Sequence, residues 1–217
     1  MHVGDYMKLY FLNTSEFDLS MCEKMFSYVD EKRRERFLKN GDISRLAAGA
    51  LLTLAFNNCG IDYLGEEKIL NKNGKESFKY LNVKYNISHS DAMCVCGIYN
   101  DEIGVDCENI NNKYNCLNIA KRFFTENEYR HILSSENETE EFTRIWTMKE
   151  AYIKYTGKGF AIPLKTFECI PNGDTVNLNG ASVKTYRILN TFVSVCAKAE
   201  KFPDKLTDVT QFFLQSC

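Results

Sequence analysis

The longest apolar stretch, residues 46–56, places the strongest constraint on how this chain folds. It runs from Leu46 to Phe56 without a charged residue. The stretch is too short to cross a bilayer, so it predicts a helix that is buried inside a folded protein. The helix is expected to extend from about residue 43 to residue 58, where Cys59-Gly60 provides a stop signal.

The overall numbers exclude several classes of protein. The chain has 217 residues, which is enough for one large domain or two small ones. Its formal net charge of −2 gives no general attraction to nucleic acid or to an anionic membrane, so an anionic ligand needs a local basic cluster. The N-terminus lacks an apolar core of signal-peptide length. The nine cysteines include no C-x-x-C pair and are expected to be reduced, mostly buried thiols of a cytoplasmic protein.

Hydrophobic periodicity divides the chain into two similar halves that meet near Asn100. Each half contains a long helix and several strands, which predicts an α+β protein with two lobes, residues 1–100 and 101–217. No proline- or glycine-rich linker separates them, so we expect the lobes to pack closely around a ligand cleft. The predicted strands are 8–12, 83–88, 93–99, 103–107, 184–189 and 192–197, and the predicted helices are one capped by Ser20, 43–58, 117–124, 128–133 and 138–155.

Two acidic residues, Asp106 and Glu108, lie two positions apart on a predicted strand. Their side chains therefore point to the same face, where their charges repel each other. A hard cation with oxygen ligands, such as Mg²⁺, would resolve that conflict. The alternative is a pair of solvated acids at the end of a strand, which the spacing alone favours.

A second pair, Glu150 and Lys154, lies one turn apart on the long predicted helix, in the favourable acid-to-base order. A surface salt bridge would explain this pair without any chemistry. Trp146 occupies the preceding turn of the same stripe, which indicates that this face is not fully exposed. If the helix packs beside Asp106 and Glu108, the carboxylates and the lysine together suit a metal and a phosphate.

Other polar residues admit both a structural and a functional interpretation. Ser88 and His89 at a strand end form either an ordinary turn or a phosphate site. Gly74-Lys75 is a turn that carries a cation. The basic stretch that starts at Lys32 is either a solvated helix face or a site for a multiply charged anion. Glu128 completes a capping box with Thr125, and this structural interpretation ranks first.

Taken together, these motifs resemble those of the Sfp-type 4'-phosphopantetheinyl transferases, enzymes of the holo-carrier-protein synthase type. The resemblance covers nearly the whole chain from Met7, which makes residues 1–6 an extension. Several blocks in the same order and at the same spacing form a more specific signal than any one of them. The matching blocks are Asn86-Ile87-Ser88-His89-Ser90, Ile103-Gly104-Val105-Asp106-Cys107-Glu108, Ala120 to Phe124 with Glu128-Tyr129, and Trp146 through Lys149-Glu150-Ala151 to Lys154 and Gly157-Lys158-Gly159.

The resemblance implies a role for individual residues. It implies Mg²⁺ held by Asp106, Glu108 and Glu150, and a pyrophosphate contact from Lys154. It matches Glu128 with a family acid near the metal, in competition with its capping role. The residues that it places against coenzyme A are Gly74 and Lys75 near the adenine, Ser88 and His89 near the 3'-phosphate, and, in a looser alignment, Lys32, Arg36 and Arg45.

The implied activity is Mg²⁺-dependent transfer of 4'-phosphopantetheine from coenzyme A to a serine of an apo acyl or peptidyl carrier protein, with release of 3',5'-ADP. Asp106, Glu150 and Lys154 are the implied catalytic residues, and Glu150 is the expected base, directly or through water. The resemblance further implies related lobes in a pseudo-twofold arrangement, each a mostly antiparallel sheet with a long helix. A cytoplasmic monomer is expected, in secondary metabolism or fatty-acid synthesis.

Three alternatives belong to other functional classes. A non-catalytic module that only binds carrier proteins would keep the fold but lose a carboxylate or Lys154, and all four residues are present. A metal-dependent phosphohydrolase would release 3',5'-ADP without a carrier protein. A purely structural protein would bind neither Mg²⁺ nor coenzyme A.

Two positions depart from the family pattern around the expected nucleotide site. Glu76 stands where the family often has proline, which implies a less rigid adenine loop. Leu46 stands where some members carry a hydroxyl, which implies one phosphate contact fewer.

Overall fold

The computed structural model describes residues 6–111 and 115–215, and its mixture of helices and antiparallel sheets confirms the predicted α+β class. The extension at residues 1–6 lies outside the described residues except for Tyr6. The helices are α1 (Leu19–Lys24), α2 (Glu31–Asn40), α3 (Ile43–Asn57), α4 (Cys116–Phe123), α5 (Glu126–Leu133), α6 (Glu138–Thr156) and α7 (Thr210–Gln215), with short 3₁₀ turns at Met25–Tyr28, Gly159–Ala161 and Leu164–Thr166.

Two four-stranded sheets form the centre of the molecule. The first has the order β10-β1-β5-β4 and the second has the order β6-β9-β8-β7. All neighbouring strands are antiparallel except β1 and β10, which are parallel. The strands are β1 (Lys8–Asn13), β2 (Lys68–Leu70), β3 (Glu76–Phe78), β4 (Lys84–Ser90), β5 (Met93–Tyr99), β6 (Ile103–Asn109), β7 (Thr175–Leu178), β8 (Ala181–Ile188), β9 (Thr191–Ala197) and β10 (Thr207–Asp208).

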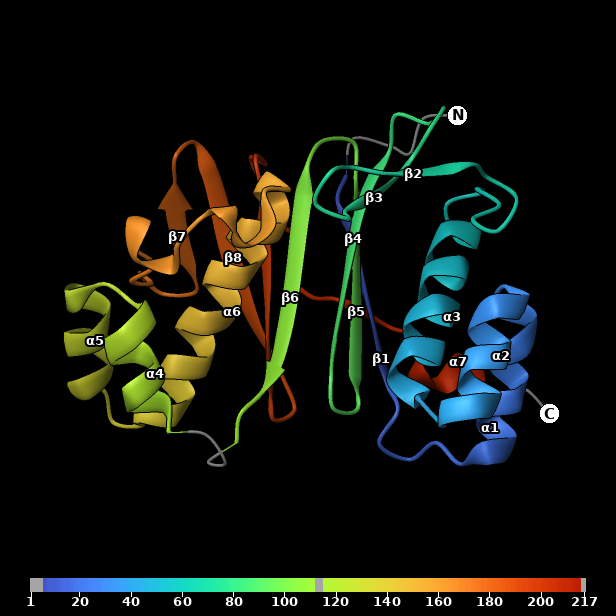
Figure 1. The fold of residues 1–217 in the computed structure, drawn as a ribbon, viewed down its shortest axis with the longest axis horizontal. Coiled ribbons are helices and arrows are strands. Elements are labelled where there is room, and N and C mark those ends of the chain that lie inside the picture. The colour runs from blue at the N-terminus through green and yellow to red at the C-terminus, as the bar shows by residue number, and fades with distance from the viewer. Residues whose placement is uncertain (1–5, 112–114, 216–217) are drawn as a thin grey trace.

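The two sheets face each other, and the long helices α3 and α6 cover their outer faces (Figure 1). This arrangement gives three apolar cores, because each helix packs on a sheet and the sheets pack on each other. Strand β5 shows the alternation: Cys94 and Cys96 enter the core beside α3, whereas Met93 and Val95 enter the core between the sheets. Strand β6 does the same on the other side, with Ile103, Val105 and Cys107 facing the central core.

Helix α3 confirms the buried helix predicted from the apolar stretch. Its residues from Leu46 to Phe56 are all buried. The carboxylate of Asp42 caps its first turn by accepting a hydrogen bond from the Arg45 backbone amide. This buried part of the helix needs cover on every side, and the first sheet, α1 and α2 together supply it.

The long helix α6 confirms the prediction for the second half. Asn137 caps its first turn, and Gly157 ends it in the left-handed conformation at φ 63°. Its inner residues, including Ile145, Met148 and Ala151, are fully buried against the second sheet. The helix therefore has one fixed rotation about its axis, which determines where its polar residues point.

Three local features differ from the sequence predictions or add to them. The cap of the first helix is Asp18 rather than Ser20, because the Asp18 carboxylate accepts from the Met21 amide. The polar turn at 71–74 joins two three-residue strands, β2 and β3. The last segment returns to the first half, where β10 pairs with β1 and Phe213 enters the first core. The division at residue 100 stays a prediction, since this segment of the second half packs on the first.

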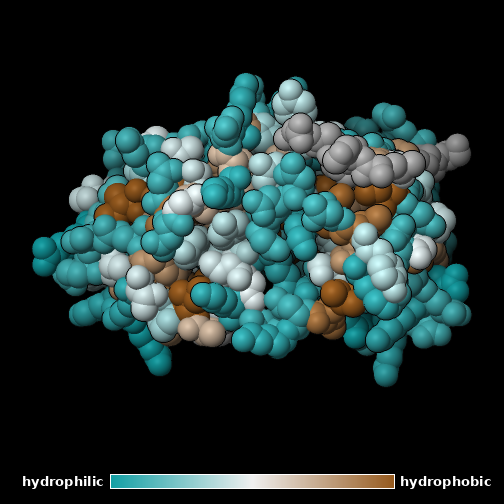
Figure 2. Space-filling model, turned by 90° about the horizontal axis from the view of Figure 1, so that it is seen from above, coloured by the Kyte–Doolittle hydropathy of each residue, from teal (hydrophilic) through white to brown (hydrophobic). Residues whose placement is uncertain are grey.

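Hydrophilic residues cover most of the face that is seen from above, and the hydrophobic residues form separate patches (Figure 2). Within the described ranges, no helix is both long and apolar enough to span a membrane. The eight cysteines in these ranges are free thiols, and all but Cys59 are buried.

Candidate active site

Strand β6 and helix α6 lie against each other at Gly104. A β-carbon added to Gly104 would lie 2.1 Å from the Ala151 carbonyl oxygen and 2.2 Å from the Tyr155 amide nitrogen. Only glycine allows the two backbones to approach this closely. The contact brings the acidic face of β6 to the face of α6 that carries Glu150 and Lys154. The long helix therefore does pack beside Asp106 and Glu108, which spacing alone could not show.

We expect Gly104→Ala to destabilise the protein by about 3 kcal/mol, because the backbone atoms of Ala151 and Tyr155 on α6 leave the methyl group no space. Urea denaturation monitored through Trp146 fluorescence measures this change. Gly60→Ala is the matched control, since no atom lies within 4 Å of an added β-carbon there, and its positive φ costs only about 1–2 kcal/mol. Equal losses in both variants would contradict the close-contact argument.

Asp106, Ser88 and Lys154 form a closed triangle of polar contacts. The Lys154 ammonium donates to Asp106 Oδ1 at 2.6 Å and to Ser88 Oγ at 2.9 Å. The Ser88 hydroxyl in turn donates to Asp106 Oδ1 at 3.0 Å. Burial lowers the pKa of Lys154, but the attraction and hydrogen bond of Asp106 outweigh it and leave that pKa raised. The ammonium therefore stays charged inside a partly buried site.

The other two acidic residues, Glu108 and Glu150, are half-buried near this triangle. Burial raises the pKa of Glu108 and of Glu150, and the negative charge of Asp106 raises both further. Glu108 accepts a hydrogen bond from the Ser90 hydroxyl at 2.6 Å. Three carboxylates thus influence one another across the contact between β6 and α6.

Side chains of β4, rather than its backbone groups, join this strand to β6. Val105 donates its amide hydrogen to Asn86 Oδ1 at 2.8 Å, and Ser88 and Ser90 donate to Asp106 and Glu108. These alternate residues of β4 form a row that we call the seam. The seam explains the Asn86 to Ser90 motif, because every second residue points to β6.

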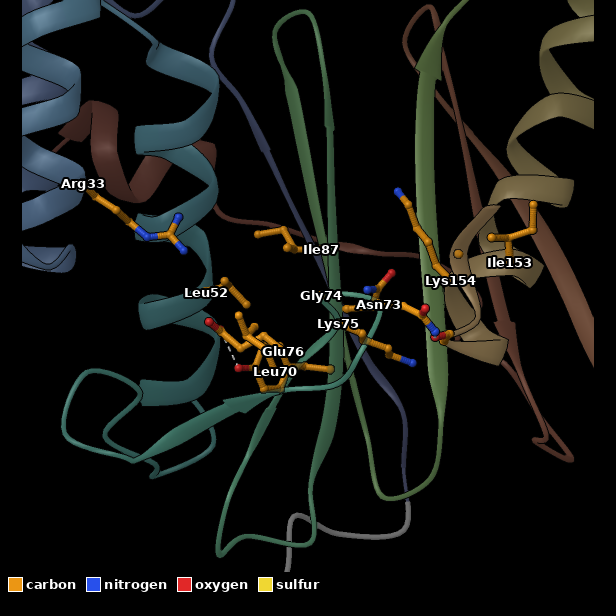
Figure 3. Close-up of a pocket in the computed structure, with 14 residues that line it drawn as sticks. Arg33, Leu52, Leu70, Asn73, Gly74, Lys75, Glu76, Ile87, Ile153 and Lys154 are labelled. Carbon is orange, nitrogen blue, oxygen red and sulfur yellow. Dashed lines mark hydrogen bonds between the residues drawn. The ribbon is translucent and has the colours of Figure 1, made fainter. Parts of the chain in front are cut away.

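A pocket of about 390 Å³ lies between the two halves, beside the triangle. Lys154 extends into it from α6, and Leu52 and Arg33 lie on the opposite side (Figure 3). The remaining residues that line it are Leu70, Asn73, Gly74, Lys75, Glu76, Tyr85, Asn86, Ile87, Ile153, Gly157 and Gly159. Cations and amides converge on a partly apolar space, as in sites that bind nucleotides.

The turn that contains Gly74 and Lys75 is fastened to the end of α6. Lys75 donates to Glu102 at 2.6 Å and to the Ile103 carbonyl at 3.1 Å, while Asn73 donates to the Gly157 carbonyl at 2.7 Å. The Lys75 ammonium is therefore already paired, although the residue lines the pocket. Its expected contact with adenine stays a prediction.

The predicted basic residues Lys32, Arg36 and Arg45 line a separate pocket of about 300 Å³ on α2 and α3. Desolvation lowers the pKa of His89; Asp42 opposes this shift, and the charges of Lys154 and Arg45 add to it. The charges that act on His89 thus come from α6 as well as from α3 and its cap. The structure brings Asp106, Ser88 and Lys154 into contact, whereas Lys32 and Arg36 belong to this second pocket.

Glu128 lies in the core of the second half, where its surroundings confirm the capping box. It accepts from the Thr125 amide at 2.8 Å and from the Cys169 amide at 2.7 Å, and it pairs with Lys149 at 2.7 Å. Both side chains of this pair are fully buried. These contacts account for Glu128 without a metal.

Asp106, Glu108 and Glu150 have the hard oxygen donors that Mg²⁺ prefers. Burial and the repulsion among these carboxylates together raise the pKa of Glu108 and of Glu150, and a bound cation would relieve the repulsion. In residues 6–111 and 115–215, however, no three acidic, histidine or cysteine side chains are gathered as a metal site. The donor set fits the metal in its chemistry, while Lys154 holds one Asp106 oxygen.

Two pocket residues, Arg33 and Asn73, were predicted only as members of a basic stretch and of a polar turn, and not as residues of this pocket. Arg33 belongs to a run of basic residues in which no pattern distinguishes the side chain that turns inward. Asn73 could have been found, because asparagine in a polar turn often bonds to neighbouring backbone.

Comparison with known proteins identifies the family. A family model for the 4'-phosphopantetheinyl transferase superfamily matches residues 102–201. The 4'-phosphopantetheinyl transferase ffp of Bacillus subtilis is 31% identical over 87% of this chain and 90% of its own length, and Sfp of the same species is 30% identical over the same shares. HetI of Nostoc is 36% identical over 62% of this chain and 56% of its own. The chain therefore belongs to the Sfp-type 4'-phosphopantetheinyl transferases and is an enzyme of that family.

Proposed function

We propose that this enzyme transfers the 4'-phosphopantetheine group from coenzyme A to a serine of an apo acyl or peptidyl carrier protein. The observation that carries this proposal is the triangle of Asp106, Ser88 and Lys154 at the wall of a pocket between the halves. A lysine that stays charged beside a carboxylate suits a pyrophosphate together with the metal ion that accompanies it.

Coenzyme A would occupy the pocket with its adenine near Gly74 and Lys75. Its 3'-phosphate would lie near Ser88 and His89 and toward the basic pocket of Lys32, Arg36 and Arg45. The pyrophosphate would then reach Lys154, whose raised pKa keeps its charge. This placement runs from the basic pocket of α2 and α3 to the acidic residues of β6 and α6.

Asp106, Glu108 and Glu150 would hold Mg²⁺, which when bound supplies charge stabilisation to the phosphates. In this proposal Lys154, which holds Asp106 Oδ1, would move its donation to the pyrophosphate when the site is occupied. The two glutamates are suited to the metal because burial and mutual repulsion disfavour their isolated charges.

In the proposed reaction, the carrier's serine oxygen forms a bond to the phosphorus next to the pantetheine arm. The bond from that phosphorus to the bridging oxygen breaks, and 3',5'-ADP leaves. Glu150 accepts the serine proton, directly or through water, and Lys154 stabilises charge on the leaving phosphate. Glu150 is available because it makes no hydrogen bond or ion pair with the residues that the structure describes.

The lobes at 1–100 and 101–217 are proposed to be related by a pseudo-twofold axis, with the active site in the cleft between them. A long helix covers the outer face of a four-stranded sheet in each half, with β10 of the second half completing the first sheet, and this supports the relation. The proposed form of the enzyme is a cytoplasmic monomer. Residues from both halves of one chain line the pocket, which supports the monomer.

Intact-mass measurement tests the proposal. Purified enzyme, coenzyme A, Mg²⁺ and an apo carrier protein should give a carrier that gains one phosphopantetheine, and omission of Mg²⁺ with a chelator should abolish the gain. Release of 3',5'-ADP without any carrier would favour a phosphohydrolase. Binding of carriers without modification, across a panel of them, would favour a non-catalytic module.

A further inference from the structure

The three acidic residues of β6 and α6 share one cation, Lys154. Its ammonium forms an ion pair with Asp106, and its charge also acts on Glu150. Glu108 forms no ion pair with the part of the chain that the structure describes, and its side chain accepts instead from a neutral hydroxyl. One ammonium therefore serves as the counter-ion of a cluster that contains three carboxylates.

Lys154 covers Asp106 on the side of the pocket between the halves. Its nitrogen lies 2.6 Å from Asp106 Oδ1, and its side chain is 29% exposed, whereas that of Asp106 is 9% exposed. Lys154 extends into the pocket (Figure 3), while Asp106 is not among the residues that line it. An anion that arrives through this pocket therefore meets the ammonium before it meets the carboxylate.

Asp106 is the carboxylate that links the other two. Its negative charge acts on both Glu108 and Glu150. These two glutamates line different pockets, one of about 260 Å³ beside Trp146 and one of about 600 Å³ beside Phe123. The residue that Lys154 occupies is thus the central member of the acidic cluster.

A divalent cation cannot join Asp106 without repulsion while the ammonium stays there. At a separation of a few ångströms, repulsion between like charges lowers the affinity for the metal strongly. Because the pKa of Lys154 is raised, loss of its proton does not relieve this repulsion. The metal needs the ammonium to leave Asp106, and the ammonium needs another anion to receive it.

We propose that Lys154 is an internal counter-ion that keeps divalent metal out of the free enzyme and admits it only together with the pyrophosphate of coenzyme A. This inference rests on the proposed function. The pyrophosphate would receive the ammonium and leave Asp106 open, so that metal and nucleotide bind with positive cooperativity. Since coupling between two ligands is reciprocal, each should raise the affinity for the other by the same factor.

Titration with Mn²⁺, followed by electron paramagnetic resonance, tests this without any reaction, because Mn²⁺ takes the same oxygen ligands as Mg²⁺. The titration is run at about pH 8, where carboxylates are ionised. Acetyl-coenzyme A should tighten Mn²⁺ binding to the wild-type enzyme at least about tenfold.

Lys154→Met should raise the affinity of the nucleotide-free enzyme for Mn²⁺ at least about tenfold, because the repelling charge is gone. The further gain from acetyl-coenzyme A should be smaller than in the wild type. A lysine that only held the metal ligands in place would have the opposite effect, since its removal would weaken Mn²⁺ binding. Lys154→Gln keeps a donor for Asp106 without the charge, so it should behave like Lys154→Met and replaces that variant if it does not fold.

Lys84→Met is the matched control. Lys84 lies on β4, its ammonium is 3.9 Å from Glu102, and it lines none of the pockets beside the acidic residues. Its removal takes away the same charge and should change Mn²⁺ affinity less than about twofold.

Folded Lys154 variants that bind Mn²⁺ no more tightly than the nucleotide-free wild type would overturn the inference. Wild-type enzyme that transfers no phosphopantetheine to any carrier would instead overturn the proposed function. The two results are independent, because Mn²⁺ binding to the nucleotide-free enzyme requires neither coenzyme A nor a carrier.

Discussion

Asp106→Asn is expected to lower kcat/KM for phosphopantetheine transfer at least about a hundredfold. Asparagine keeps the size of the side chain and can still accept from Ser88. It removes the charge that pairs with Lys154 and one carboxylate of the proposed metal set. Both losses act where charge develops on the phosphates, so the effect should fall mainly on kcat.

The intact-mass assay, run as a time course at several coenzyme A concentrations, measures this change. Asp204→Asn serves as a control, because Asp204 is exposed and lies outside the described pockets. Thermal denaturation establishes that both variants fold. Full activity in a folded Asp106→Asn enzyme would remove Asp106 from the catalytic site.

Lys149→Met should lower the free energy of unfolding by about 3–5 kcal/mol. The substitution leaves the Glu128 carboxylate buried without its cation, and both side chains are fully buried in the wild type. It also frees the carbonyls of Leu164 and Phe167, which accept from Lys149 at 2.8 and 2.6 Å. Urea denaturation under reducing conditions measures the loss.

A double variant separates the buried charge from simple loss of packing. Glu128→Gln combined with Lys149→Met removes both charges and should be at least about 1 kcal/mol more stable than Lys149→Met alone. Lys198→Met, on an exposed lysine, should stay within about 0.5 kcal/mol of wild type. A double variant that is less stable than the single one would contradict the charge argument.

Local patterns predicted the main elements and the faces of the site. Alternation placed Asp106 and Glu108 on one face of β6, and helical spacing aligned Glu150 with Lys154, as the structure confirms. Spacing could not show that these faces meet, because the meeting depends on the absence of one β-carbon at Gly104. Whether the same residues hold Mg²⁺ and coenzyme A stays a prediction.

Features that depend on contacts between distant parts of the chain could not be predicted from the sequence. Strand β10 has only two residues and pairs with β1, almost two hundred positions earlier, so no local pattern marks it. Strands β2 and β3 are too short for alternation to be visible. The Arg33 side chain packs against Gly49 of α3, and neither residue alone predicts this contact.

The seam between β4 and β6 has a consequence for how a substrate can enter. A backbone ladder opens cooperatively, since its bonds share one rigid register. The bonds from Asn86, Ser88 and Ser90 each depend on a separate side-chain rotamer. An anion that took up the Ser88 hydroxyl would therefore break one of these bonds and leave those of Asn86 and Ser90 in place. The two halves are thus held together, beside the site of chemistry, by hydrogen bonds that can open one at a time.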